Sequence, residues 1–278
     1  MEFYLLMLRG EKHIILLFTG LLAGLGACTE KIDLQLDTGE PRIVIEGSIS
    51  NRQQSQIVKI TQSSGYFSTA QPVPVEGAIV TLSDSANQIN LTETFSGIYL
   101  TPPFFAGVPG TEYTLTVETG GKIYTAHSVM PRPPVIDSIN FSEDDVDPLL
   151  FHIRLYAPES PVPGDHYFFG VFREGIYQTD NLTKLIFATD KLINGRYIYG
   201  LPVQSVEASP GNRVTLQMAA IPKDFFDYSI SVLRVTVYND NPFEQAPANP
   251  PGNISGGALG FFYAFAEARK TRMIRIIN

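Results

Sequence analysis

The chain has little of two residue types that disulfide-rich domains and sugar-binding proteins use heavily. It contains 278 residues with a single cysteine, Cys28, and no tryptophan. One cysteine cannot form a disulfide within its own chain. Tryptophan is the usual stacking platform for sugars, so its absence weakens a carbohydrate-binding interpretation. The 13 tyrosines and 18 phenylalanines are able to replace it, so that interpretation stays open.

Motifs for metal binding and catalysis are also scarce. The four histidines form no HxxxH or HExxH pair, which argues against zinc. The sequence has no Gly-x-Ser-x-Gly nucleophile motif and no Walker-type phosphate loop. The acidic run at 143–147 lacks the spacing and the glycine of an EF-hand, so we interpret it as a surface loop. The sequence therefore predicts no catalytic residue, no metal site and no cofactor.

Positive charge and long hydrophobic runs are limited as well. The chain has 20 Lys and Arg against 28 Asp and Glu, a net charge of −8. This sign argues against nucleic-acid binding and against electrostatic adhesion to anionic lipid. Beyond the N-terminal region, the longest apolar candidate is 230–238, which Ser231, Arg234 and Thr236 interrupt. Membrane attachment would therefore have to come from the N-terminus.

The N-terminus has the layout of a bacterial lipoprotein signal. A basic region at 9–13 precedes a mostly apolar run at 14–25, which is too short to span a bilayer comfortably. Cys28 follows this run after two small residues. We predict that residues 1–27 are removed and that acyl chains on Cys28 hold the protein on a membrane. The alternative is an ordinary secretory signal with an incidental cysteine.

The predicted cleavage site consists of Leu25, Gly26 and Ala27. Gly26 and Ala27 are the small residues that a signal peptidase needs next to the cut. Residues 28–40 are polar and acidic, and we interpret them as a tether between the lipid and the first domain. The acidic residues of this tether resemble the signal that sends lipoproteins of Bacteroidota to the outer face of the outer membrane; the alternative is a solvated linker.

Residues 41–130 alternate apolar and polar side chains in short runs, for example at 43–49 and 112–118. Such alternation means that each strand buries one face and exposes the other. Seven short strands at roughly even spacing predict a mainly β fold, with an N-terminal β-sandwich of immunoglobulin-like or transthyretin-like type.

The proline-rich segment 131–134 is predicted to be a stiff linker between two domains. Residues 135–278 are again rich in predicted strands and indicate a second β-rich domain, either a sandwich or a jelly-roll-like fold. Pro222 stands at a suitable first helical position, and apolar residues then recur at helical spacing. We predict one helix at 222–238; the alternative is another pair of strands.

Aromatic residues gather in two predicted strands of the second half. They exceed what one buried face of a strand needs, so they indicate a surface that meets a partner. The alternative is a sheet buried on both faces beneath the predicted helix. The residues predicted for the partner surface are Tyr167, Phe169, Phe243 and Phe262.

Several spaced segments, together with Cys28, carry a resemblance to a known family; they are 43–47, 75–80, 97–99, 113–115, 134–139 and 253–262. In this order they resemble an uncharacterised lipoprotein family of Bacteroidota, classed as a domain of unknown function. The resemblance covers nearly the whole mature chain. It implies an outer-membrane location and, through gene neighbourhood, a TonB-dependent receptor as partner. It assigns no catalytic residue.

Two short motifs, Asp84-Ser85-Ala86 and Asp137-Ser138-Ile139, are similar to the sites where Bacteroidota attach O-glycans to exported proteins. Ser85 and Ser138 are therefore predicted glycosylation sites. Matches of three residues also arise by chance.

These features support three functional hypotheses from different classes. The first is a non-enzymatic, lipid-anchored, surface-facing lipoprotein that binds a ligand as an accessory component of a TonB-dependent receptor. The second is a structural or adhesive surface lipoprotein without a transport role. The third is a hydrolase, which would need three polar groups converging in a cleft around His152 or His166.

Overall fold

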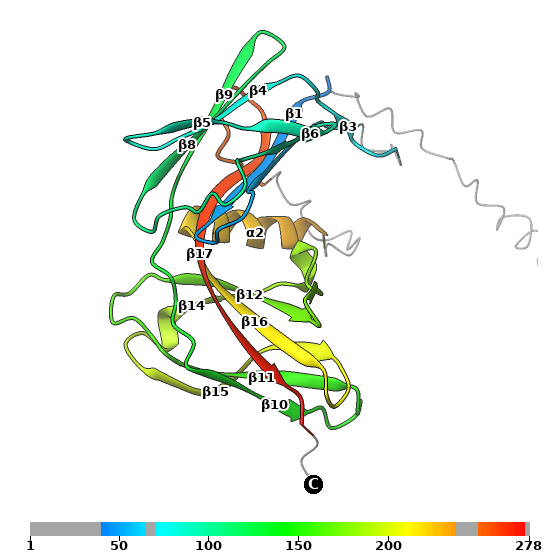
Figure 1. The fold of residues 1–278 in the computed structure, drawn as a ribbon, viewed down its shortest axis with the longest axis vertical. Helices are drawn as coiled ribbons and strands as arrows, with labels where there is room; N and C mark the ends of the chain where they lie inside the picture. The colour runs from blue at the N-terminus through cyan, green and yellow to red at the C-terminus, as the bar shows by residue number, and fades with distance from the viewer. Residues whose placement is uncertain (1–39, 65–69, 237–249, 276–278) are drawn as a thin grey trace, which may run out of the picture. The chain divides into compact units, whose positions relative to one another are not determined.

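The computed structural model describes residues 40–64, 70–236 and 250–275. In these ranges the chain is mainly β with one α-helix, which confirms the predicted fold class (Figure 1). The described residues all belong to one compact unit. The predicted signal segment, its cleavage site, Cys28 and the tether up to residue 39 lie outside the described residues.

The first half of the described chain consists of short strands joined by turns. Its strands are β1 (Ile43–Ser50), β2 (Ile57–Gln62), β3 (Val73–Pro74), β4 (Ile79–Ser83), β5 (Gln88–Asn90), β6 (Thr92–Phe95), β7 (Ile98–Leu100), β8 (Glu112–Thr119) and β9 (Lys122–Val129).

The second half adds longer strands, the helix and two 3-10 turns. Its elements are β10 (Ser138–Glu143), β11 (Leu150–Pro158), β12 (His166–Arg173), β13 (Ile176–Tyr177), η1 (Leu182–Lys184), β14 (Ile186–Thr189), η2 (Asp190–Leu192), β15 (Tyr197–Glu207), β16 (Arg213–Ala220), α2 (Lys223–Thr236) and β17 (Leu259–Met273).

The described strands form three sheets. The largest follows the order β13-β12-β16-β17-β1-β2-β7-β6, with β14 beside β12 and β3 beside β2. The order is β5-β4-β8-β9 in the second sheet and β10-β11-β15 in the third. The large sheet therefore contains strands from both halves of the chain.

Two main hydrophobic cores lie on the large sheet. In the first core, Ile45 and Ile49 of β1 meet Leu115 of β8, and each is at most 1% exposed. In the second core, Leu216 of β16 meets Leu155 of β11, and both are fully buried. Alternate residues of each strand enter these cores, which is the period-two burial that the sequence predicts.

The last strand, β17, belongs to both halves. Its first part pairs in parallel with β1, from Val44 opposite Leu259 to Ser50 opposite Phe265. Its second part pairs antiparallel with β16, from Ala220 opposite Ala266 onward. Fifteen residues in a strand span roughly 50 Å at about 3.3 Å per residue, which is long enough to reach across both main cores. The predicted boundary at 131–134 therefore does not divide the fold into two independent units.

Helix α2 covers the face of the large sheet that points away from the second core. It occupies Lys223–Thr236, inside the range predicted from the helical spacing. Asp224 lies in its first turn, where a negative charge favours the positive end of the helix dipole. Phe225 anchors the helix in a third core with Phe168 of β12 and Phe261 of β17.

The predicted aromatic partner surface is wrong for the residues that the structure describes. Tyr167, Phe169 and Phe262 are 5%, 4% and 0% exposed. Tyr167 and Phe169 point into the second core, while Phe168 between them packs beneath α2. This part of the sheet is buried on both faces, the alternative that the sequence left open. Phe243 lies outside the described residues.

Candidate functional site

A groove of about 480 Å³ lies between α2 and the outer face of the large sheet. Neighbouring strands supply its floor through residues that alternate outward, away from the first core. The helix supplies one wall through residues at spacings of three and four, which share one helix face. The floor residues are Glu46, Ser48, Ile57, Lys59, Phe261 and Tyr263, and the wall residues are Leu182, Phe225, Tyr228 and Val232.

Aromatic rings from α2 and β17 line one side of this groove. The rings of Phe225 and Tyr263 stack with centroids 3.5 Å apart and planes 7° apart. Tyr228 and Phe261 lie 4.8 Å apart with tilted planes. Phe225 and Phe261 are buried, while Tyr228 and Tyr263 are partly exposed and present ring surface to the groove. This side therefore offers apolar surface that the protein itself does not cover completely.

Polar groups from the neighbouring strands β1 and β2 line the other side of the groove. Glu46 and Lys59 are direct cross-strand neighbours, and their charged atoms lie 3.5 Å apart. Burial raises the pKa of the Tyr228 hydroxyl, and the negative charge of Glu46 raises this pKa further. Burial also raises the pKa of Tyr263, partly offset by a hydrogen bond with Ser48. Both tyrosines therefore stay neutral hydrogen-bonding groups at physiological pH.

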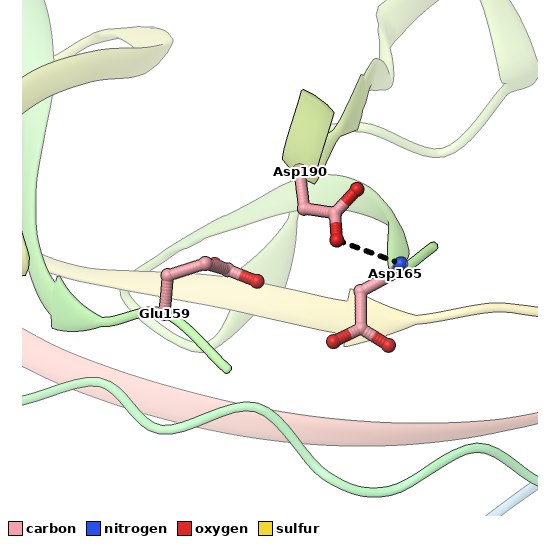
Figure 2. Close-up of side chains that lie close together, drawn as sticks. All are labelled: Glu159, Asp165 and Asp190. Carbon is pink, nitrogen blue, oxygen red and sulfur yellow. Dashed lines mark hydrogen bonds between the residues drawn. The ribbon is translucent and has the colours of Figure 1, made fainter. Parts of the chain in front are cut away.

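A second candidate is a cluster of three carboxylates, which we call the acidic cluster: Glu159, Asp165 and Asp190 (Figure 2). One oxygen from each lies within 4.8 Å of the others. Glu159 and Asp190 are 7% and 2% exposed. With Arg132 and prolines of the 131–134 segment, Glu159 and Asp165 also line a cavity of about 190 Å³.

Hydrogen bonds inside the protein already hold the acidic cluster. Asp190 Oδ2 accepts from the backbone N–H groups of Gly164 and Asp165, at 2.8 and 3.1 Å. Glu159 Oε1 accepts from the Tyr167 hydroxyl at 2.7 Å. Calcium takes six to eight oxygen ligands, so these three carboxylates would supply part of a calcium shell. The same hydrogen bonds also explain the arrangement without an ion.

Burial and like charge act together on Glu159. Burial is the larger cause and raises the pKa of its carboxyl group, and the charges of Asp165 and Asp190 raise it further. The hydrogen bond from Tyr167 opposes this shift. Burial and the neighbouring Glu159 in turn raise the pKa of Tyr167. A protonated Glu159 is therefore the form that this site favours, relative to an exposed glutamate.

A third arrangement surrounds His152, on the outer face of the β10-β11-β15 sheet. Its Nδ1 lies 2.9 Å from Ser205 Oγ and its Nε2 lies 3.0 Å from Asp144 Oδ2. Ser205 is the cross-strand neighbour of His152. In a serine-hydrolase triad the nucleophile bonds Nε2 and the acid bonds Nδ1, the reverse of this arrangement.

Other features of the His152 arrangement also differ from a catalytic triad. The backbone N–H of Ser205 donates to Gln204 Oε1 at 2.9 Å, so it is not free to stabilise an oxyanion. Asp144 accepts from the backbone N–H groups of Val146 and Asp147, which keep its pKa below the ordinary range. These bonds make the 143–147 run a self-capped turn between β10 and β11. His152 is thus a strand residue with local hydrogen bonds, as its sequence context indicates.

The two predicted glycosylation sites lie in different surroundings. Ser85 is exposed at the turn between β4 and β5, where Asp84 Oδ1 accepts from the N–H groups of Ala86 and Asn87. Ser138 is half-buried at the start of β10, opposite Tyr156. Ser85 is the more accessible of the two.

Sequence reasoning did not find the groove or the acidic cluster. The groove combines β1, β2, α2 and β17, which are distant in the sequence. The acidic residues stand singly at 159, 165 and 190, whereas the densest acidic run lies elsewhere. One signal was present for the groove: the aromatic residues around Phe261 and Phe225 exceed the needs of a single core.

Two solved structures are similar to this chain at low sequence identity. No helix in the described ranges has the length and apolar character that crossing a membrane requires. A two-domain fibronectin type-III segment of chicken tenascin is 16% identical; the match covers 65% of this chain and 90% of that one, with a TM-score of 0.20. A cytokine receptor complex is 9% identical, covering 66% of this chain and 85% of that one, with a TM-score of 0.26.

No curated protein matches the chain. A family model, described as a domain of unknown function, matches residues 29–271. This range includes nearly all of the described residues, with the groove and both polar arrangements. Because the match covers most of the chain, the protein belongs to the DUF4249 family.

Proposed function

We propose that this protein is a non-enzymatic lipoprotein of the Bacteroidota outer membrane that binds a ligand as an accessory component of a TonB-dependent receptor. Acyl chains on Cys28 anchor it, and the β fold faces the cell surface. The observation that carries the binding role is the aromatic groove beneath α2. Binding sites for small molecules are typically concave, mostly apolar and about 300–1,000 Å³ in volume, and the groove meets each criterion.

The anchor is supported by the sequence. Cys28 directly follows the small residues Gly26 and Ala27 after an apolar run of signal-peptide length. Two or three acyl chains hold a protein on a membrane far longer than one chain does. The protein would therefore work at the membrane surface, within reach of an integral receptor.

The anchor and the receptor are tested separately. Cells grown with radiolabelled palmitate should label the wild-type protein and not Cys28→Ala, and the variant should leave the membrane fraction. Extraction of native membranes with mild detergent should recover the protein together with a TonB-dependent receptor. An unlabelled protein would remove the anchor from the proposal, and a protein recovered alone would remove the receptor.

A further inference from the structure

We propose that the groove holds one small amphipathic molecule, with a flat unsaturated body and a polar end that carries no net charge. The inference rests on the proposed binding function and deepens it by naming the site and the class of ligand. It follows from three properties of the groove: its rings, its paired charges and its size.

The aromatic side of the groove, formed by α2 and β17, selects the flat body. Tyr228 and Tyr263 present partly exposed rings there, next to the buried rings of Phe225 and Phe261. Aromatic pairs in stacked or edge-to-face contact gain stability beyond their buried area. An unsaturated ring system therefore gains more from this lining than a flexible alkyl chain of the same area does.

The polar side of the groove, formed by β1 and β2, selects against net charge. Glu46 and Lys59 face each other at 3.5 Å, with side chains 58% and 47% exposed, so their charges largely cancel. A charged ligand group would lose hydration without finding an unpaired opposite charge. A neutral or zwitterionic end finds both a donor and an acceptor there, together with the hydroxyl group of Ser48.

The volume and the shape of the groove set the size of the ligand. About 480 Å³ falls in the lower half of the range for pockets that hold drug-sized or cofactor-sized molecules. The groove is concave, with strands as its floor and α2 as its wall. One compact molecule is the occupant that this geometry fits.

The probe for this proposal is N-phenyl-1-naphthylamine, a neutral, flat aromatic amine whose fluorescence rises in apolar surroundings. The full chain is placed in lipid nanodiscs, and the signal of matched empty nanodiscs is subtracted. We expect saturable binding of one probe per chain. Ile57→Trp fills the groove floor from a strand residue that is 52% exposed, and it should weaken binding at least tenfold.

The matched control is Ile79→Trp. Ile79 is a strand residue of similar exposure, 59%, but it lies on β4 and outside the groove. It should change the affinity less than twofold. Tyr228→Ala should weaken binding severalfold with the helix signal in circular dichroism retained. Equal affinity in the two tryptophan variants, or no saturable binding, would overturn the proposal.

The paired charges give an independent readout. Anilinonaphthalene sulfonate is an anionic probe of similar shape, and it should bind at least tenfold more weakly than the neutral probe. Glu46→Gln leaves Lys59 unpaired and should reduce the difference in affinity between the neutral and the anionic probe. If the wild-type chain forms a dimer in light scattering and Ile57→Trp breaks it, the groove is an interface between copies and the small-molecule site is wrong. If palmitate does not label the chain, the same probe titrations are run in buffer without nanodiscs, so the anchor proposal and the groove proposal fail separately.

Discussion

The aromatic groove and the acidic cluster differ in whether the protein itself covers or pairs their side chains. In the groove, Tyr228 and Tyr263 keep ring surface uncovered, and the side chains of Glu46 and Lys59 stay half-exposed. In the acidic cluster, Asp190 and Glu159 are buried and accept hydrogen bonds from neighbouring groups of the same chain. The His152 arrangement resembles the acidic cluster in this respect, because its polar atoms are also bonded to one another.

This difference shows how a functional surface and a structural polar cluster are distinguished. A buried polar group without a partner costs free energy, so internal hydrogen bonds are what a fold supplies when no ligand is present. Internal hydrogen bonds cannot compensate in this way for uncovered aromatic surface in a concave site. The groove is therefore the feature on which the proposed ligand binding rests, while the acidic cluster is explained by the folded chain itself.

The largest loss of stability should come from disrupting β17, one of the strands that form the groove floor. Gly260 has φ +97°, and a Cβ placed there would lie 2.1 Å from the backbone oxygen of Ile45. Gly260→Ala should lower the free energy of unfolding by roughly 4 kcal/mol, because β1 and β17 cannot separate without losing their pairing. Gly257→Ala has a positive φ but no atom within 4 Å, and it should cost about 1 kcal/mol. Equal losses in urea unfolding would contradict this role of Gly260.

The next effect concerns the wall of the groove. Phe225 is 6% exposed and packs against Phe261 and Tyr263, so Phe225→Ala should destabilise the protein by about 3 kcal/mol and loosen α2. Val235 lies on the same helix and is 40% exposed; Val235→Ala should cost about 0.5 kcal/mol. Hydrogen exchange of the helix amides measures the loosening. Unchanged protection in Phe225→Ala would show that other contacts hold the helix.

In the acidic cluster, substitution of a buried carboxylate should raise the stability instead of lowering it. The pKa of Glu159 is raised in the folded protein, so its contribution to stability is fully present below its ordinary pKa of 4.5 and is lost as pH rises through the folded pKa. Glu159→Gln removes the charge and keeps an acceptor for Tyr167. It should raise the stability by about 1 kcal/mol at pH 7.5 and leave it unchanged at pH 4.

Glu93 is the control for the sign of this effect. Hydrogen bonds from the backbone N–H groups of Gly77 and Gly97 lower the pKa of Glu93, so its contribution is present above 4.5 and is lost as pH falls. Glu93→Gln should therefore destabilise the protein at pH 7.5. If millimolar calcium raises the melting temperature of the wild type but not of Glu159→Gln, the acidic cluster is a cation site and the contrast with the groove fails.

The smallest effect is expected at the His152 arrangement. The reversed hydrogen-bond pattern and the occupied N–H of Ser205 predict that this serine is not an activated nucleophile. A fluorophosphonate probe should leave the wild type unlabelled, and Ser205→Ala should be indistinguishable from it in this assay. Stoichiometric labelling of Ser205 would contradict the non-enzymatic proposal.

Much of the local structure was predictable from the residues. The alternation around Ile45 predicts a half-buried strand, and Pro222 followed by helical spacing predicts α2. The burial of the aromatic residues Tyr167 and Phe169 was harder to predict, because a sheet buried on both faces and a sheet with an exposed patch have the same composition. The packing of α2 on one face and β11 on the other decided this point.

The sequence by itself determined the mainly β fold, the one described helix and, as a prediction, the lipid anchor on Cys28, because period-two alternation, helical spacing and signal layout are local patterns. Only the tertiary structure decided that β17 pairs with both β1 and β16, and that Glu46, Tyr228 and Tyr263 meet around one groove. These pairings join segments from opposite ends of the chain. They depend on complementary shape and buried area between elements, which no single stretch of sequence records.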